Sequence, residues 1–382
     1  MQCTVLVGGD MCPTSGDIDL FCRGDAAGVF HDLLEDFARA DLTVVNLECP
    51  LTDRETPIAK IGPNLRAPTA CMNAIRKSGI GLLDLANNHI LDHGAQGLES
   101  TLRLAESAGI ATVGAGRNRS EARRILIRKV GDVRIGIFGV AEHEFSIAGM
   151  DSPGANPLDL IDIVRNIAAR REEWDFLIVL LHGGNEGYPY PSPRLMDTCR
   201  FLVEQGAGAV ICHHSHCPGC WESYNGGHIV YGQGNLVFGN PNAGASWYEG
   251  FLVHLSISKN GNAEMSLVPY EQSRESAGVT KLQGTAAATL LESIAERSSQ
   301  ISNAGFVHHR WIRFCEENKR TYFSGLFHHG RVLNLLGRVP HLRNFLYPPA
   351  ALRLTGALMR CEAHREVLEM VIFPPDRSPP PS

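Results

Sequence analysis

Short runs of hydrophobic residues recur along the first two thirds of the chain, separated by segments with hydrophobic residues at helical spacing. The runs predict buried strands, and the spacing predicts amphipathic helices. Strands are expected at residues 4–7, 42–45, 80–85, 110–113, 133–140, 176–181, 209–212 and 229–231, and helices at 25–39, 69–78, 95–108, 158–171 and 193–205. Because strand and helix alternate over most of residues 4–240, the pattern favours an α/β fold.

The pattern changes after residue 240. Residues 251–255 and 265–268 are typical of an antiparallel hairpin, and the Asn-Gly pair between them favours a tight turn. From about residue 284 the pattern becomes helical, and proline dominates the last residues. We therefore expect one domain over 1–272, a helical C-terminal extension over 284–372, and a disordered Pro-rich tail over 373–382. The extension is either a solvated helical appendage or a small cap or interaction surface.

Composition narrows the class of protein. The chain has 382 residues, of which 44% are hydrophobic, and a net charge of -6, which gives no reason to expect a nucleic-acid partner. Its eleven cysteines are irregularly spaced, as expected for reduced thiols rather than a disulfide framework. No signal-like segment or apolar run of about 20 residues is present. These features predict a soluble, cytoplasmic protein without a membrane anchor, and they leave the oligomeric state open.

Acids, amides and imidazoles follow several of the predicted strands. Each has an ordinary explanation by itself, such as a turn for Asp10 or a helix N-cap for Asn88. Together they are hard to explain by packing, because a buried ionisable group costs several kcal/mol unless it is paired or bound to metal. Open α/β sheets bind ligands at the carboxyl ends of their strands, and mixed oxygen and imidazole donors suit Zn, Mn or Fe. The candidate ligands are Asp10, Glu48, Asn88, His182, His214 and His216.

Seven ordered motifs within residues 4–240 carry a resemblance to a known family. They are 9–11, 46–52, 85–94, 114–116, 181–186, 213–216 and 231–238. The chain resembles the CapA family of poly-γ-glutamate capsule biosynthesis proteins, in the calcineurin-like metallophosphoesterase superfamily. The resemblance implies a four-layer αββα sandwich of the metallophosphoesterase type that holds one or two divalent transition metals (Mn, Fe or Zn).

Site roles follow from the resemblance by position. It implies a first metal on Asp10 and His216, a second on Asn88, His182 and His214, and Glu48 between the two. His89 takes the place of the superfamily's histidine beside the leaving group. In such enzymes metal-activated water attacks phosphorus, and this histidine protonates the leaving oxygen.

Some positions depart from the superfamily pattern or stay open. Cys12 stands where the superfamily has a histidine, so it is either a thiolate ligand or a core residue, and the first metal site would be weak or empty in the second case. Glu48 is one methylene longer than the usual aspartate. His213 and Asn46 are candidates to bind metal or to support its ligands. Three further residues are candidates for substrate contact: Glu186, Tyr188 and Asn235.

Three functions remain in competition. The first is a metal-dependent hydrolase of a phosphoester or related bond in a small molecule or polymer. The second is a metal-dependent enzyme that forms or cleaves γ-glutamyl or other amide bonds in poly-γ-glutamate or natural-product biosynthesis. The third is a non-catalytic assembly partner with a degenerate metal site. Capsule members usually carry an N-terminal anchor, whereas this sequence begins on its first strand, so a soluble relative acting on a small molecule is expected.

Overall fold

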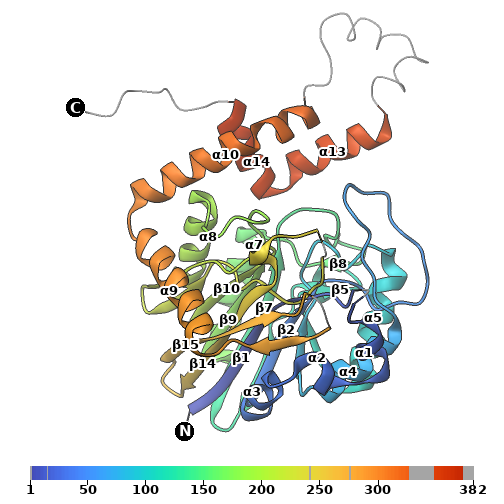
Figure 1. Ribbon diagram of the computed structural model, residues 1–382, viewed down its shortest axis with the longest axis vertical. Helices are drawn as coiled ribbons and strands as arrows, with labels where there is room; N and C mark the ends of the chain where they lie inside the picture. The colour runs from blue at the N-terminus through green and yellow to red at the C-terminus, as the bar shows by residue number, and fades with distance from the viewer. Residues whose placement is uncertain (1, 15, 241, 275–276, 327–347, 373–382) are drawn as a thin grey trace, which may run out of the picture.

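Two β-sheets lie face to face in the computed structural model, which describes residues 2–14, 16–240, 242–274, 277–326 and 348–372 (Figure 1). The first sheet has the order β16-β15-β14-β1-β2-β3-β4, and β13 pairs with β1 beyond the end of its pairing with β14. Its strands are β1 (Gln2–Met11), β2 (Leu42–Leu47), β3 (Leu82–Asp84), β4 (Ala111–Val113), β13 (Asn235–Val237), β14 (Glu249–Ser258), β15 (Ala263–Gln272) and β16 (Val279–Lys281). Strands β1 to β4 run parallel, and β14 to β16 are antiparallel additions at one side.

The second sheet has the order β11-β12-β10-β9-β7-β6. Its strands are β6 (Leu126–Val130), β7 (Val133–Ala141), β9 (Phe176–His182), β10 (Ala209–His213), β11 (Trp221–Tyr224) and β12 (Gly227–Val230). The four inner strands are parallel to one another. A separate small ribbon joins β5 (Ala115–Gly116) and β8 (Gly154–Ala155).

Helices cover the outer face of each sheet. Over the first sheet lie α1 (Ile18–Arg23), α2 (Ala26–Phe30), α3 (Leu33–Arg39), α4 (Met72–Lys77) and α5 (Gly94–Ala108), with the 3-10 turn at Thr69–Cys71. Over the second lie α7 (Leu160–Ala169) and α8 (Pro193–Glu204). The remaining short segments are α6 (Arg119–Ala122) and the 3-10 turns Arg171–Glu173 and Ala245–Trp247.

The strands explain why four layers form. In β9, Ile178 and Leu180 pack between the two sheets, whereas Val179 and Leu181 pack under the helices of the second sheet. Successive side chains of a strand point to opposite faces, so a strand that is buried on both faces reads as a continuous hydrophobic run. The result is the αββα sandwich that was predicted, and the α/β fold class is confirmed.

Some local predictions needed correction. The helix expected at 25–39 is two helices, because the chain turns at His31, whose φ of 41° lies in the left-handed region. Strands β6, β11, β13 and β16 and helix α1 were not predicted. Strand β6 is a partly exposed edge with Arg128 and Lys129 in its centre, and β13 and β16 are too short to give a period. Because β16 pairs with β15, the first sheet continues past the predicted domain boundary at residue 272.

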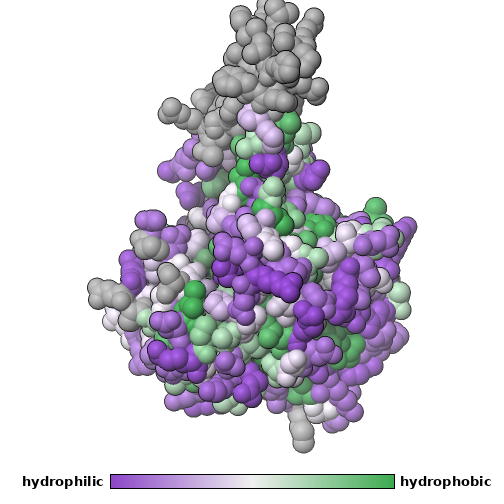
Figure 2. All heavy atoms as spheres, turned by 90° about the vertical axis from the view of Figure 1, so that its right-hand side faces the viewer, coloured by the Kyte–Doolittle hydropathy of each residue, from purple (hydrophilic) through white to green (hydrophobic). Residues whose placement is uncertain are grey.

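The C-terminal extension begins with α9 (Gly284–Gln300), which packs against β11 and β15. It continues with α10 (Ala304–Leu326), α13 (Pro349–Arg360) and α14 (Glu362–Ile372), which stand on one end of the sandwich (Figure 1). Seen from the side, this narrower part presents hydrophobic and hydrophilic residues intermixed (Figure 2). The predicted Pro-rich tail at 373–382 lies outside the described residues.

Two further findings bear on the sequence predictions. Each of the eleven cysteines is free, as expected for reduced thiols. In the described parts of the chain, no helix has both the length and the apolar character needed to cross a membrane.

Candidate metal centre

The carboxyl ends of parallel strands from both sheets meet at the end of the sandwich that carries the extension. The first sheet contributes Asp10 within β1, Glu48 just after β2, and Asn88 after β3. The second contributes His182 at the end of β9 and the segment after β10. All the predicted ligands are buried, with at most 7% of any of them exposed: Asp10, Glu48, Asn88, His182, His214 and His216.

Glu48 lies at the centre of this group. Its Oε1 is 3.5 Å from Nε2 of His182 and 3.6 Å from Nε2 of His216. On the His182 side, that Nε2 is 3.0 Å from Oδ1 of Asn88 and 3.1 Å from Nδ1 of His214. On the other side, Nδ1 of His216 is 3.4 Å from Oδ2 of Asp10. The structure thus gathers the candidates around Glu48, and their division between two metal ions stays a prediction.

These separations fit donors that share a cation. Two ligands with bonds of about 2.1 Å to one ion lie about 3.0 Å apart in octahedral and about 3.4 Å apart in tetrahedral geometry. The separations around Nε2 of His182 and Nε2 of His216, 3.0–3.6 Å, are close to these values. Donor atoms of Glu48, His214 and His216 also lie within 4.8 Å of one another.

The Glu48 carboxylate gives independent support for a cation. It is fully buried, and neither of its oxygens has a hydrogen-bond partner among the described residues. Burial raises the pKa of Glu48 well above its usual range, and the nearby Asp10 raises it further. An unpaired buried carboxylate is costly, and a divalent cation would remove that penalty. The donor set and the unsatisfied carboxylate therefore fit a metal centre.

The imidazoles are in the form that binds metal. Burial lowers the pKa of His182 well below its usual range, and His214 lowers it further. Burial also lowers the pKa of His216. Both rings are therefore neutral near pH 7, and only a neutral imidazole has a lone pair for a cation.

The backbone after β10 is bent to deliver its histidines. His214 has a φ of 87° and His216 a φ of 52°, a left-handed conformation that few residues other than glycine adopt. The bend lets the backbone N–H of His214 donate a hydrogen bond to Oδ2 of Asp10 at 3.0 Å. Strain of this kind concentrates at functional sites, where the surrounding structure holds it in place.

Other predicted polar residues support the ligands. Strand pairing places Asn46 and Asn235 on either side of Asp10. Nδ2 of Asn46 donates to Oδ1 of Asp10 at 2.7 Å, and Oδ1 of Asn235 accepts from Nδ1 of His216 at 2.8 Å. His213 turns toward β1, where its Nε2 is 3.2 Å from the carbonyl oxygen of Gly8. Asn235 therefore fixes the ring of His216, and its contact with substrate stays a prediction.

Three predictions meet a different environment. Cys12 is buried beside Cys49 in the core under the helices. The contact with Cys49 and burial raise the pKa of the Cys12 thiol well above its usual range. The structure therefore favours the interpretation of Cys12 as a core residue. Tyr188 packs against α10, with its ring centroid 4.4 Å from that of Phe314. This buried contact explains Tyr188 by packing and does not support the predicted contact with substrate. Glu186 is exposed in the loop after β9.

His89 belongs to a charged triad that the sequence analysis missed in part. Its Nδ1 is 2.6 Å from Oδ2 of Asp92 and 3.0 Å from Nζ of Lys60. Lys60 and Asp92 form a buried ion pair at 2.5 Å, although burial lowers the pKa of Lys60. Asp92 follows His89 by three residues, and that spacing was a usable signal. Lys60 lies in an irregular loop that gave none.

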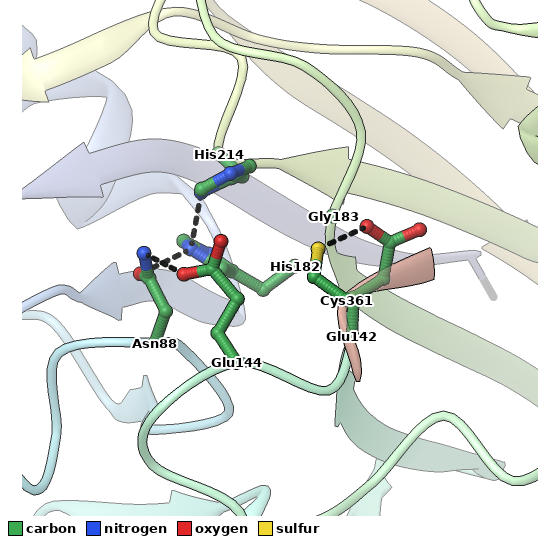
Figure 3. A pocket seen from close by; sticks show the side chains of 7 residues that line it. All are labelled: Asn88, Glu142, Glu144, His182, Gly183, His214 and Cys361. Carbon is green, nitrogen blue, oxygen red and sulfur yellow. Dashed lines mark hydrogen bonds between the residues drawn. The ribbon is translucent and has the colours of Figure 1, made fainter. Parts of the chain in front are cut away.

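A small pocket opens beside the His182 side of the centre (Figure 3). Its wall includes Glu144, whose Oε2 accepts a hydrogen bond from Nδ2 of Asn88 at 2.6 Å, and Cys361 from the C-terminal extension. Gly183 also lines it, and a side chain there would collide with Glu142. Neither Glu144 nor Cys361 was predicted as a site residue.

Helix α14 supplies one more charged neighbour. Nε2 of His364 lies 3.2 Å from Oε1 of Glu144. Burial alone would raise the pKa of Glu144, but the hydrogen bond from His364 and the nearby imidazoles lower it to about 2. Burial lowers the pKa of His364, but the Glu144 hydrogen bond and charge outweigh this and raise it. The two side chains therefore form an ion pair next to the centre.

A buried set of oxygen and imidazole donors at the strand ends of an αββα sandwich defines a candidate metal-binding site. The model of the family described as "Bacterial capsule synthesis protein PGA_cap" matches residues 4–240. Because this match spans more than half of the chain, the chain belongs to that family.

Curated relatives carry related names. The chain is 28% identical over 250 residues to the "Capsule biosynthesis protein CapA" of Bacillus anthracis, covering 63% of this chain and 60% of that protein. It is 32% identical over 263 residues to a "Probable polyglutamine synthesis accessory protein" of Mycobacterium tuberculosis, covering 61% and 67%. The match spans less than two thirds of the Bacillus anthracis relative.

Solved structures show more distant likeness. A phosphatase of Mycoplasma pneumoniae has a TM-score of 0.47 at 11% identity, with 70% of this chain and 93% of that chain covered. The NAD nucleotidase of Haemophilus influenzae has a TM-score of 0.41 at 13% identity, with 84% and 60% covered. At these values neither likeness bears on the activity of this chain.

Proposed function

We propose that the chain is a metal-dependent hydrolase of a phosphoester or related bond, in a small molecule or a polymer. The observation that carries the proposal is the buried Glu48 carboxylate without hydrogen-bond partners, set between two groups of imidazole, amide and carboxylate donors. Beside it stands a histidine–aspartate pair suited to proton transfer. Together these groups can bind cations and protonate a leaving group.

Each residue has a role in this proposal. Asp10 and His216 would hold one cation, and Asn88, His182 and His214 would hold the second. Glu48, whose Oε1 faces His182 and His216, would be a ligand available to both groups. When bound, the cations (Mn, Fe or Zn) supply charge neutralisation at a phosphoryl group and lower the pKa of water.

His89 would donate the proton. Its Nδ1 is engaged by Asp92, which leaves Nε2 as the atom that can reach a substrate. The carboxylate fixes the orientation of the ring, as in other proton-transferring histidines. His89 is 8% exposed, so the ring borders solvent without being surrounded by it.

Two other functions keep a specific observation in their favour. Family membership and the capsule relatives favour an enzyme that forms or cleaves γ-glutamyl or other amide bonds. The relative named as an accessory protein favours a non-catalytic assembly partner. The phosphoester proposal is preferred because His89 and Asp92 retain a proton-donor arrangement that an assembly partner would not need.

The first test measures hydrolysis of p-nitrophenyl phosphate and bis-p-nitrophenyl phosphate by the full chain loaded with Mn²⁺. We expect metal-dependent release of p-nitrophenol and a loss of about 10²- to 10⁴-fold in kcat for His89→Gln, because the variant lacks the proton donor. His309→Gln, an exposed position on α10, is the matched control and keeps full activity.

The alternatives predict different results. Release of nitroaniline from γ-glutamyl-p-nitroanilide with both phosphate esters intact would favour amide chemistry. A metal-loaded chain that leaves all three compounds intact would contradict the hydrolase proposal and favour the assembly partner.

A further inference from the structure

Helix α14 contacts the loop after β7 residue by residue. Sγ of Cys361 is 3.9 Å from Oε2 of Glu142. In the next pair, Glu362 accepts a hydrogen bond from the backbone N–H of His143 at 2.8 Å and lies 2.5 Å from its Nδ1. The third contact joins His364 to Glu144. Three consecutive loop residues therefore have partners at the start of α14, namely Cys361 just before the helix and Glu362 and His364 within it, more than 200 residues away along the chain.

A second set of contacts anchors the same helix to α8. Glu366 accepts hydrogen bonds from Oγ of Ser192 at 2.5 Å and from the backbone N–H of Arg194 at 3.1 Å. The Arg194 guanidinium lies between Glu366 and Glu142 and pairs with both. These contacts seat α14 in a definite position, so the placement of His364 beside Glu144 does not depend on that pair alone.

The Asn88 amide is the link to the metal centre. Its two ends differ chemically, because Oδ1 can bind a cation and Nδ2 can only donate hydrogen bonds. A carboxylate accepts hydrogen bonds only, so Glu144 holds Nδ2 toward itself at 2.6 Å. The opposite end, Oδ1, then faces Nε2 of His182 at 3.0 Å (Figure 3). Glu144 thus selects the amide orientation that a cation needs.

His364 is in turn held from two sides. Its Nε2 faces Glu144, and its Nδ1 lies 2.9 Å from the hydroxyl oxygen of Tyr322 on α10. Glu144 is 8% and His364 31% exposed at the side chain, so the pair is largely withdrawn from water. Both partners of the imidazole come from elements that meet only in the folded chain.

We propose that His364 is a positioning residue of the metal centre: through Glu144 it keeps Oδ1 of Asn88 directed at the cation that Asn88, His182 and His214 would share. This inference rests on the proposed metal-dependent function and makes the C-terminal extension a part of the site. Residues that orient metal ligands typically contribute 10- to 100-fold to metal affinity.

The test is a calorimetric titration of the full-length, metal-free chain with Mn²⁺. We expect the wild-type chain to bind at least one ion, at the group of Asn88, His182 and His214. His364→Gln should weaken that binding event by about 10-fold or more and leave any second event unchanged. Glu144→Gln, which changes the partner of His364 in the sandwich, should weaken the same binding event. The double variant should lose little more than either single variant, because both act through one chain of contacts.

Two control variants separate positioning from loose docking. Glu362→Gln removes the α14 carboxylate that contacts His143 without touching Glu144, and Glu369→Gln changes an exposed acid on the same helix. Both should bind Mn²⁺ within about threefold of wild type, since neither side chain contacts Glu144 or His364 and glutamine can keep a hydrogen bond to the backbone N–H of His143. Circular dichroism of each variant is the check that its helices are kept.

The possible failures are distinguishable. Unchanged Mn²⁺ affinity in His364→Gln and Glu144→Gln, or an equal loss in Glu362→Gln, would overturn the positioning role and leave the hydrolase proposal standing. A loss of both binding events together would also overturn it, because it indicates general disruption. A wild-type chain that binds no Mn²⁺ would overturn the proposed function and this inference with it.

Discussion

At the scale of single residues, the candidate metal centre contains a buried polar group whose burial is unfavourable without a cation. Glu48 is buried among His182, His216 and Asp10, yet its oxygens lack hydrogen-bond donors in the described structure. Natural proteins rarely leave a buried polar atom unpaired, so each such atom calls for an explanation. Metal binding explains this one, and burial keeps the surrounding imidazoles in the neutral form that can bind a cation.

This reasoning predicts how stability responds to Glu48→Gln. The folded chain raises the pKa of Glu48 above its usual 4.5. The folded state therefore holds a proton that the unfolded state releases, and metal-free stability falls as pH rises from about 4.5 through the raised pKa. Glutamine removes that titration. At pH 7.5 we expect the metal-free variant to melt at or above the wild-type temperature.

With metal bound, we expect the wild-type chain to be more stable than Glu48→Gln. A cation at 100 times its Kd stabilises a protein by about 2.7 kcal/mol, and Glu48→Gln should lose most of this gain. Differential scanning calorimetry with and without Mn²⁺ measures both effects. A metal-free variant clearly less stable than wild type, or an equal Mn²⁺-induced shift in both proteins, would contradict this account.

The sequence indicated the candidate ligands more readily than the residues that contact them. Each of the six candidate ligands follows a recognisable predicted strand. The local pattern was therefore enough to predict that they lie together at one end of the sheets. By contrast, Glu144 lies in an irregular loop, and His364 sits on an amphipathic helix like many others. Their importance arises from contacts between distant segments, which a local pattern does not encode.

At the scale of elements, α14 is the part whose role the sequence could not give. Its periodicity predicted a helix, and the structure confirms one at Glu362–Ile372. What the pattern left open was whether the extension is an appendage or a cap. The contacts of α14 with the loop after β7 and with α8 favour the cap.

The docking of α14 should depend on pH. The hydrogen bond to Glu362 raises the pKa of His143, and the Glu144 contact outweighs burial and raises that of His364. Groups with raised folded pKa values stabilise fully below their ordinary value, here 6.5, and lose this effect as pH rises through the folded value. Glu362, whose pKa is lowered by His143 against the effect of burial, contributes only above about 4.5.

We therefore expect α14 to be held most firmly between about pH 4.5 and 6.5 and to loosen above that range. Hydrogen exchange of its backbone amides, corrected for intrinsic rates, should accelerate several-fold between pH 6.5 and 9. Amides of β9, buried in the sandwich, provide the internal reference. Protection of α14 that stays constant or increases over this range would contradict the proposed ion pairs.

At the scale of the whole molecule, the centre exists only because two sheets pack together. The first sheet provides the acids and Asn88, and the second provides the histidines. The strand runs and their alternation with helices were enough to predict the layers. The edge strands β6 and β11 and the short β13 and β16 were missed, because partly exposed or three-residue segments carry little periodic signal.

The central claim is that side chains from both sheets hold divalent cations around Glu48. Anomalous diffraction from crystals of the full chain grown with Zn²⁺ tests it most directly. The account predicts one or two anomalous peaks within about 2.2 Å of the Glu48 carboxylate and of imidazole nitrogens of His182, His214 or His216. The absence of any peak there, with a well-ordered Glu48 hydrogen-bonded to protein or water instead, would contradict it.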